Sequence, residues 1–493
     1  MDKGNNTIQA FWVALGSLSS FSLAIVSAAI LSRYFDKVEY GTYKQIVYVY
    51  STLLIVFSAG LPNVFSYFLP RYKLEQGKEI VDKLTKVLLS LGLGFGILLF
   101  ISAGLIADVL KNPEIEKGLR YFSVIPIFLL PTLGIEGIFS TYKKTVFIAI
   151  YNTITRFLML IFIVTPVIFY GGNYLFAIYG WIIVSIISFF LALYFKNIPF
   201  RGVEKQKSGL GIQEIFQYSV PIMFASIGGI IMRSSDQFYI SRYFGTESFA
   251  DYSNGFIQLP FVGMITGAAA TVLMPIFSKI ISEKSDINVL VETWESTLIK
   301  SATIIYPMVI FFILNAEAII IILFTDLYLN SILFFQLAMA VNFFNIIIFS
   351  PLILALGKTK FYANIHFLFA GLTWLGGYLA VSFFDTPYHI AAISVLINIL
   401  LIISVLKYSA GIMKIGITKL IPFKALAKLT LHGGVVFLAT KFLIDLTPLY
   451  NFPLVSLSII GLIGSLILLF TGPLLQLDYL SSIKPLLDKI RKI

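Results

Sequence analysis

The chain has 493 residues, of which 58% are hydrophobic and only 12% are charged, so most of it is expected to lie in lipid, because no soluble core could hide that much apolar surface. It has no cysteine and only three scattered histidines, which excludes disulfides and thiolate ligands and argues against a metal or other cofactor site. The net charge of +11 indicates basic cytoplasmic loops and not a nucleic-acid-binding surface, as is usual for a membrane protein.

Apolar runs of about twenty residues, each long enough to cross the hydrocarbon of a bilayer, recur along the whole chain. The first run is longer than the apolar core of a secretory signal and has one lysine before it, so it is predicted to be an uncleaved span. The sequence therefore predicts an all-α integral membrane protein with fourteen transmembrane helices, near 10–32, 42–69, 84–107, 119–140, 145–170, 174–195, 213–241, 252–277, 301–324, 332–356, 361–384, 388–408, 424–446 and 453–475.

The lysine and arginine residues support this count independently. With a cytoplasmic N-terminus, most of the 36 basic residues fall in predicted inner segments, with clusters at 71–86, 143–144, 196–207 and 484–492. A miscounted span would scramble this alternation. Both termini are therefore expected to be cytoplasmic.

The tetrapeptide Ser-Arg-Tyr-Phe occurs twice, at 32–35 and 241–244, each time between two long apolar runs. A repeat this far apart is typical of two homologous halves of a membrane bundle. A chance match in a chain rich in Phe and Tyr is the alternative, although the flanking register and hydropathy agree as well. The Pro- and Gly-containing segment 196–212 is then the linker between two pseudo-symmetric six-helix lobes. The predicted domains are an N-terminal lobe at 1–196, a C-terminal lobe at 212–408, two extra helices at 422–475 and an amphipathic cytoplasmic tail at 476–493.

Charged side chains at membrane depth are rare and usually face a cavity or a partner. Arg156 lies about eleven residues into its span, which at 1.5 Å per residue places it near the midplane. Asn152 shares the same helix face one turn earlier, and Glu136 in the preceding span is a candidate partner for the arginine. Arg156 and Asn152 are therefore candidate substrate-binding residues, with a structural role as the alternative for the arginine.

Three more arginines and one aspartate are further candidates. Arg233 and Asp236 are three residues apart in the seventh span and share a face. They could form a purely structural ion pair between the halves, which is the alternative to a functional role. Arg33 and Arg242 lie at helix ends, where anchoring to lipid headgroups is the alternative to substrate binding.

Prolines within or at the ends of the spans predict kinks, because each removes a backbone hydrogen bond. Such breaks suit helices that bend during transport, but they also occur in static bundles. The prolines concerned are Pro62, Pro70, Pro126, Pro131, Pro221, Pro260, Pro275, Pro307 and Pro351.

Two sets of residues carry a resemblance to a known family. One set opens the first half and comprises Ser32 to Phe35, Gly41, Tyr43 and Pro62. The other opens the second half and comprises Pro221, Asp236, Arg242 to Gly245, Tyr252 and Pro275. Together with the fourteen spans, they resemble polysaccharide or O-antigen flippases of the multidrug/oligosaccharidyl-lipid/polysaccharide exporter superfamily.

The resemblance implies that the chain moves an undecaprenyl-diphosphate-linked oligosaccharide from the inner to the outer leaflet of a bacterial or archaeal cytoplasmic membrane. It also implies alternating access through a V-shaped cavity between the lobes, and a polysaccharide polymerase as a candidate partner. The chain lacks the dense basic run along the first helix of lipid II flippases, so an O-antigen or capsule repeat unit is the expected cargo.

Roles for the candidate residues follow from this function. The arginines would bind the diphosphate, and Asp236 or Glu136 would couple transport to protons or sodium. No bond is made or broken, so neither a catalytic residue nor a cofactor is expected.

Two other functions stay open. A multidrug or lipid II exporter of the same superfamily is one, and the cavity arginines count against a carrier of cationic drugs. A membrane-bound sugar polymerase or glycosyltransferase is the other, and the short outer loops with few carboxylates count against such an enzyme.

Overall fold

The structure, a computed structural model, describes residues 3–283 and 286–480. These residues form helices and connecting loops without a strand. Fourteen of the helical segments are long and apolar enough to cross a membrane. The predicted all-α fold with fourteen spans is therefore confirmed, while most of the predicted amphipathic tail at 476–493 lies outside the described residues.

The helices form two compact units, Met1–Ser253 and Asn254–Ile493. The first unit contains six spans and almost all of the seventh, whereas the repeat divides the chain at the 196–212 linker. The division into homologous lobes is a statement about ancestry and stays a prediction. The helices from the N-terminus through the seventh span are α1 (Lys3–Tyr34), α2 (Lys37–Ser58), α3 (Leu61–Phe68), η1 (Leu69–Arg71), α4 (Leu74–Leu110), α5 (Glu114–Phe122), α6 (Ile125–Leu129), η2 (Leu130–Thr132), α7 (Ile135–Thr141), α8 (Val146–Tyr170), α9 (Tyr174–Asn197), η3 (Ile198–Phe200) and α10 (Ile212–Gly255).

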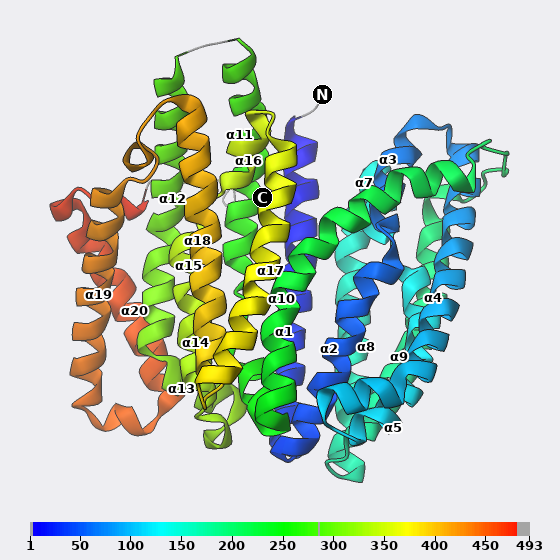
Figure 1. Cartoon of the computed structure of the whole chain (residues 1–493), viewed down its shortest axis with the longest axis horizontal. Helices are drawn as coiled ribbons and strands as arrows, with labels where there is room; N and C mark the ends of the chain where they lie inside the picture. The colour runs from blue at the N-terminus through cyan, green and yellow to red at the C-terminus, as the bar shows by residue number, and fades with distance from the viewer. Residues whose placement is uncertain (1–2, 284–285, 481–493) are drawn as a thin grey trace. The chain divides into compact units, whose positions relative to one another are not determined.

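The second unit holds the remaining seven spans. Its last two, α19 and α20, have no counterpart in the repeat; α19 packs against α12, and α20 packs against α19 and α13 (Figure 1). The helices are α11 (Pro260–Ser282), α12 (Ile287–Leu314), α13 (Ala316–Phe324), η4 (Asp326–Tyr328), α14 (Ser331–Ala340), α15 (Asn342–Asn345), α16 (Phe349–Ala355), α17 (Thr359–Phe383), α18 (Tyr388–Met413), η5 (Ile417–Lys419), α19 (Phe423–Asp445), η6 (Pro448–Asn451), α20 (Pro453–Thr471) and η7 (Gly472–Leu475).

Two spans of the first unit are broken and not merely kinked. The helix α2 ends where Ala59 and Gly60 adopt left-handed backbone angles (φ 48° and 67°), and α3 restarts with Pro62 in its first turn. The fourth span is divided into α5, α6, η2 and α7, with Pro131 in η2 and a left-handed Gly134 ahead of α7. Proline ends the hydrogen-bond ladder, and glycine tolerates the positive φ that turns the chain.

Both Ser-Arg-Tyr-Phe copies are followed by a residue with non-helical backbone angles. The first copy closes α1, and Asp36 after it has ψ 171° before α2 begins. The second copy lies inside α10, where Gly245 (φ 81°, ψ −179°) holds the equivalent position and breaks the helical path. The sequence predicts that the seventh span ends near 241, but the helix continues to Gly255 across this kink.

Buried polar contacts join α10 to α2 beside the two copies. The Gln45 Nε2 donates to Ser241 Oγ at 2.6 Å, and Asn112 Nδ2 donates to Gln45 Oε1 at 2.7 Å. An ion pair of 2.9 Å links Lys37 Nζ to Asp251 Oδ2, with both side chains largely buried. These contacts explain why α10 groups with the first unit in space.

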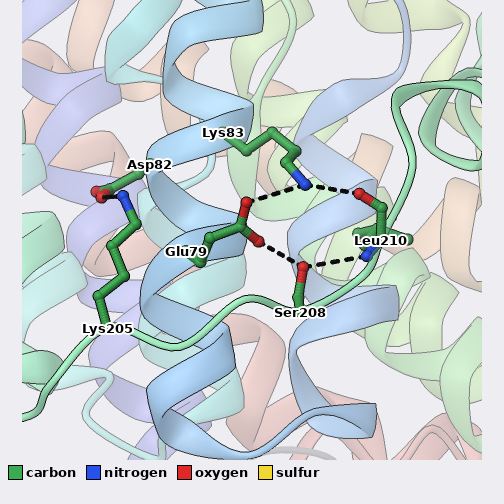
Figure 2. Close-up of polar contacts among 6 residues, drawn as sticks. All are labelled: Glu79, Asp82, Lys83, Lys205, Ser208 and Leu210. Atoms are coloured by element: carbon green, nitrogen blue, oxygen red, sulfur yellow. Dashed lines mark hydrogen bonds and ion pairs between the residues drawn. The ribbon is translucent and has the colours of Figure 1, made fainter.

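The linker after the sixth span is held against α4 by charged contacts (Figure 2). The Lys205 ammonium lies 2.5 Å from Asp82 Oδ2, and Ser208 donates to the carboxylate of Glu79. The Lys83 ammonium pairs with Glu79 at 2.9 Å and also donates to a linker carbonyl at 2.6 Å. The linker is therefore bonded along the first turns of α4.

Candidate functional site

A cavity of about 930 Å³ lies inside the first unit. Its wall comes from α1, α2, α3, α8, α9 and the break in the fourth span. The polar residues that line it are Ser17, Ser20, Ser51, Asn63, Ser66, Thr132, Glu136, Asn152, Thr155, Arg156 and Ser188. The aromatic residues that line it are Phe21, Tyr50, Tyr151 and Trp181.

The break in the fourth span builds one side of this cavity. Leu133 is extended (ψ 155°) and Gly134 is left-handed (φ 91°). A side chain at Gly134 would overlap the ring of Phe65, so glycine is needed there for both space and backbone conformation. As a result the consecutive residues 132–137 all line the cavity, whereas a continuous helix would present only one residue in three or four.

Arg156, chosen for its depth, and its two predicted neighbours Asn152 and Glu136 line this cavity together. Glu136 comes from α7, while Asn152 and Arg156 lie one turn apart on α8. The Asn152 Nδ2 donates to Glu136 Oε1 at 3.3 Å. The Arg156 guanidinium contacts Met159 Sδ at 3.6 Å, and no carboxylate of the described residues lies within ion-pair distance of it. The cavity therefore holds a cation that lacks a protein counter-ion.

A smaller cavity of about 110 Å³ shares Arg156 and adds Lys44. The Trp181 Nε1 donates to the Tyr43 hydroxyl at 2.8 Å in its wall. The Lys44 ammonium lies 5.2 Å from the centroid of the Tyr40 ring. Two basic side chains thus face this space, where an anion would be stabilised by both charges.

The other four candidates do not line either cavity. Arg33 is exposed and donates to the Ala29 carbonyl of its own helix at 2.5 Å, and Arg242 donates to a backbone carbonyl of α4. Arg233 is exposed, whereas Asp236 is buried and accepts from Tyr252 at 3.5 Å. Arg233 and Asp236 therefore face different surroundings, and the substrate-binding and coupling roles of these four residues stay predictions.

The described residues contain no group of three or more His, Asp or Glu side chains that could hold a metal ion. The charged groups that line the cavity are one arginine and one carboxylate, and the carboxylate is hydrogen-bonded to an amide. The cavity can bind an anion and can accept hydrogen bonds from, or donate them to, hydroxyl-rich ligands.

Sequence reasoning missed a buried lysine behind the cavity wall. Lys196 follows an apolar run and precedes Pro199, so it was expected in a cytoplasmic loop, but it forms part of the last turn of α9 and is only 2% exposed. Its ammonium donates to the Pro131 carbonyl at 2.7 Å and to Thr85 Oγ1 at 3.2 Å. A lysine at the end of a span usually reaches to the headgroups, so no local signal distinguishes this one.

A family profile described as "Polysaccharide biosynthesis protein" matches residues 30–333, more than half of the chain. No curated protein matches the chain significantly. Among solved structures, the chain is similar to "Lipid II flippase MurJ, inward closed conformation", with a TM-score of 0.64, 15% identity, and coverage of 94% of this chain and 99% of that one.

Two transporter structures are similar as well. The first is an inward-facing multidrug resistance MATE family transporter of the MOP superfamily, with a TM-score of 0.62, 12% identity, and coverage of 83% of this chain and 98% of that one. The second is a MOP superfamily transporter from Pyrococcus furiosus, with a TM-score of 0.55, 12% identity, and coverage of 83% and 95%. At these identities the likeness shows a common fold.

Proposed function

Because this chain belongs to the polysaccharide biosynthesis protein family, we propose that it flips a lipid-linked oligosaccharide across the cytoplasmic membrane. The cargo is an undecaprenyl-diphosphate-linked O-antigen or capsule repeat unit, which moves from the inner to the outer leaflet by alternating access. No bond of the cargo is made or broken.

The observation that carries this proposal is Arg156 in the 930 Å³ cavity. A cation at membrane depth that faces a cavity and has no carboxylate partner is costly unless an anion binds to it. The diphosphate of the lipid carrier, or an acidic sugar, supplies that anion, and a guanidinium can form two parallel hydrogen bonds to phosphate oxygens.

The rest of the wall suits a sugar. Serine and threonine hydroxyls and the amides of Asn63 and Asn152 can exchange hydrogen bonds with sugar hydroxyls. Phe21 and Trp181 provide flat apolar faces on which a sugar ring can stack. A cavity for cationic drugs would instead place carboxylates without an adjacent arginine.

For coupling we propose Glu136 as the group that binds a proton or sodium ion from within the cavity. It is exposed to the cavity and accepts a long hydrogen bond from Asn152 at 3.3 Å. Asp236 is the second candidate, because it is a buried carboxylate on α10.

The test is substitution of Arg156 in cells or vesicles that report outer-leaflet lipid-linked oligosaccharide. We expect Arg156→Ala to abolish flipping at normal protein abundance, and Arg156→Lys to recover part of it, since the charge survives but the planar pair of donors is lost. Arg120→Ala is the matched control, because Arg120 is exposed, lies outside both cavities and forms an ion pair with Glu116 on its own helix. Normal flipping by Arg156→Ala would contradict the proposal.

A further inference from the structure

The Lys196 side chain lies where α4 meets two elements of the cavity wall, η2 and α3. Its ammonium donates to the Pro131 carbonyl of η2 at 2.7 Å and to Thr85 Oγ1 of α4 at 3.2 Å, and lies 5.1 Å from the centroid of the Phe65 ring of α3. No carboxylate of the described residues lies within ion-pair distance of it. The buried Lys196 nitrogen is therefore contacted by two neutral oxygens and one aromatic face.

The Pro131 carbonyl lacks the backbone donor that it would have in a continuous helix. In an unbroken helix it would accept from the backbone N–H of Ile135. Here Leu133 is extended and Gly134 is left-handed, so the chain leaves the helical path before Ile135. A helix end also carries partial negative charge, which a cation stabilises. Lys196 replaces a hydrogen bond that the break removes.

The break is also what turns Leu133 and Glu136 toward the cavity. Phe65, beneath the lysine, packs where any side chain at Gly134 would have to go. Lys196 thus contacts both sides of the break. It bonds directly to the Pro131 carbonyl before the break, and it contacts the Phe65 ring, which packs against Gly134 within the break.

We propose that Lys196 is a positioning residue that holds the break of the fourth span in the conformation which presents Leu133 and Glu136 to the cavity. The inference rests on the proposed function of this cavity as the substrate and coupling site. A lysine can act here because its four-carbon stem reaches from α9, and its ammonium offers three donors. An apolar side chain of the same length would leave the Pro131 carbonyl buried without a donor.

The experiment measures the local conformation without any substrate. The chain has no native cysteine, so Leu133→Cys gives one thiol on the break and Ser51→Cys gives one thiol on the α2 side of the same cavity. Each is combined with Lys196→Met, Lys196→Arg or the neighbouring control Asn197→Ala. The rate of alkylation by a water-soluble maleimide is measured on purified, monodisperse protein in nanodiscs.

We expect Lys196→Met to slow alkylation at Leu133→Cys by at least about fivefold, since losing one buried hydrogen bond lets the break leave the conformation that presents residue 133 to the cavity. Alkylation at Ser51→Cys should stay unchanged. Lys196→Arg should restore most of the parental rate, because it can still donate to the Pro131 carbonyl, and Asn197→Ala should match the parent. Equal changes at both thiols, no change at either, or failure of arginine to restore the rate would overturn the positioning role.

Flipping assays separate this inference from the proposed function. If Arg156→Ala flips normally while Lys196→Met still loosens the break, the cargo assignment fails and the positioning role stands. If alkylation is unchanged in Lys196→Met while Arg156→Ala is inactive, the positioning role fails and the cargo assignment stands.

Discussion

At the scale of single residues, the cavity combines an arginine that has no carboxylate of the described residues within ion-pair distance and a weakly bonded carboxylate. Arg156 and Glu136 come from different spans, and Asn152 links the carboxylate to the helix that carries the arginine. Such an arrangement can bind an anionic cargo at the arginine and a cation at the carboxylate, so that release of one ligand changes the affinity for the other.

A prediction at this scale concerns Glu136. We expect Glu136→Gln to leave the cavity intact, because the amide oxygen can still accept from Asn152, but to abolish the acceleration of flipping by an imposed proton or sodium gradient. The measurement is flipping in vesicles with and without each gradient. The matched control is Glu116→Gln, which changes an exposed carboxylate on α5. A variant that still responds to both gradients would exclude Glu136 as the coupling group.

At the scale of elements, the broken fourth span decides what the cavity can present. The chain stops being helical at Leu133 and Gly134, and this irregular backbone is tolerated at membrane depth because it lines a cavity and is supported by neighbouring helices. Lys196 and Phe65 supply that support from α9 and α3.

Gly134→Ala tests the break directly. The new methyl group would overlap the Phe65 ring, and the left-handed φ of 91° disfavours any side chain, so we expect a loss of about 2 kcal/mol or more of stability. Gly94→Ala on α4 is the matched control, because nothing lies within 4 Å of the added methyl group, and a helical alanine stabilises by about 0.5–1 kcal/mol.

The comparison is made by thermal unfolding of both purified variants in the same detergent. A Gly134→Ala protein as stable as Gly94→Ala would mean that the break can adopt another backbone path.

At the scale of the whole molecule, the arrangement across the membrane follows from fourteen spans and the distribution of basic residues. The linker carries Lys205 and Lys207 and is bonded to the start of α4. The start of α4 also carries a basic cluster. By the positive-inside rule we expect both on the cytoplasmic side.

We predict the topology from this distribution. Single cysteines in place of Asn173 or Thr386 should be labelled by a membrane-impermeant reagent added outside intact cells, whereas one in place of Lys205 should be labelled only after permeabilisation. Outside labelling at Lys205 would overturn the arrangement of six spans before the linker and eight after it.

The sequence by itself determined the number of spans and the fold class. The hydrocarbon forms no hydrogen bonds with backbone polar groups, so each crossing must be a helix of about twenty apolar residues. This pattern is local, so each span can be recognised in the sequence independently of the others. The position of Arg156 near the middle of its span was predicted in the same way, from the rise per residue along the helix.

Only the tertiary structure decided which polar groups share a cavity. Arg33, Arg233, Arg242 and Asp236 have the same intrinsic chemistry as the cavity residues, but helix rotation and packing turn them elsewhere. Lys196 is the clearest case, because its sequence position is that of a headgroup-facing lysine. It is buried because it donates to the Pro131 carbonyl, which the break in the fourth span leaves without a backbone donor. Such an interaction between distant segments has no local pattern in the sequence.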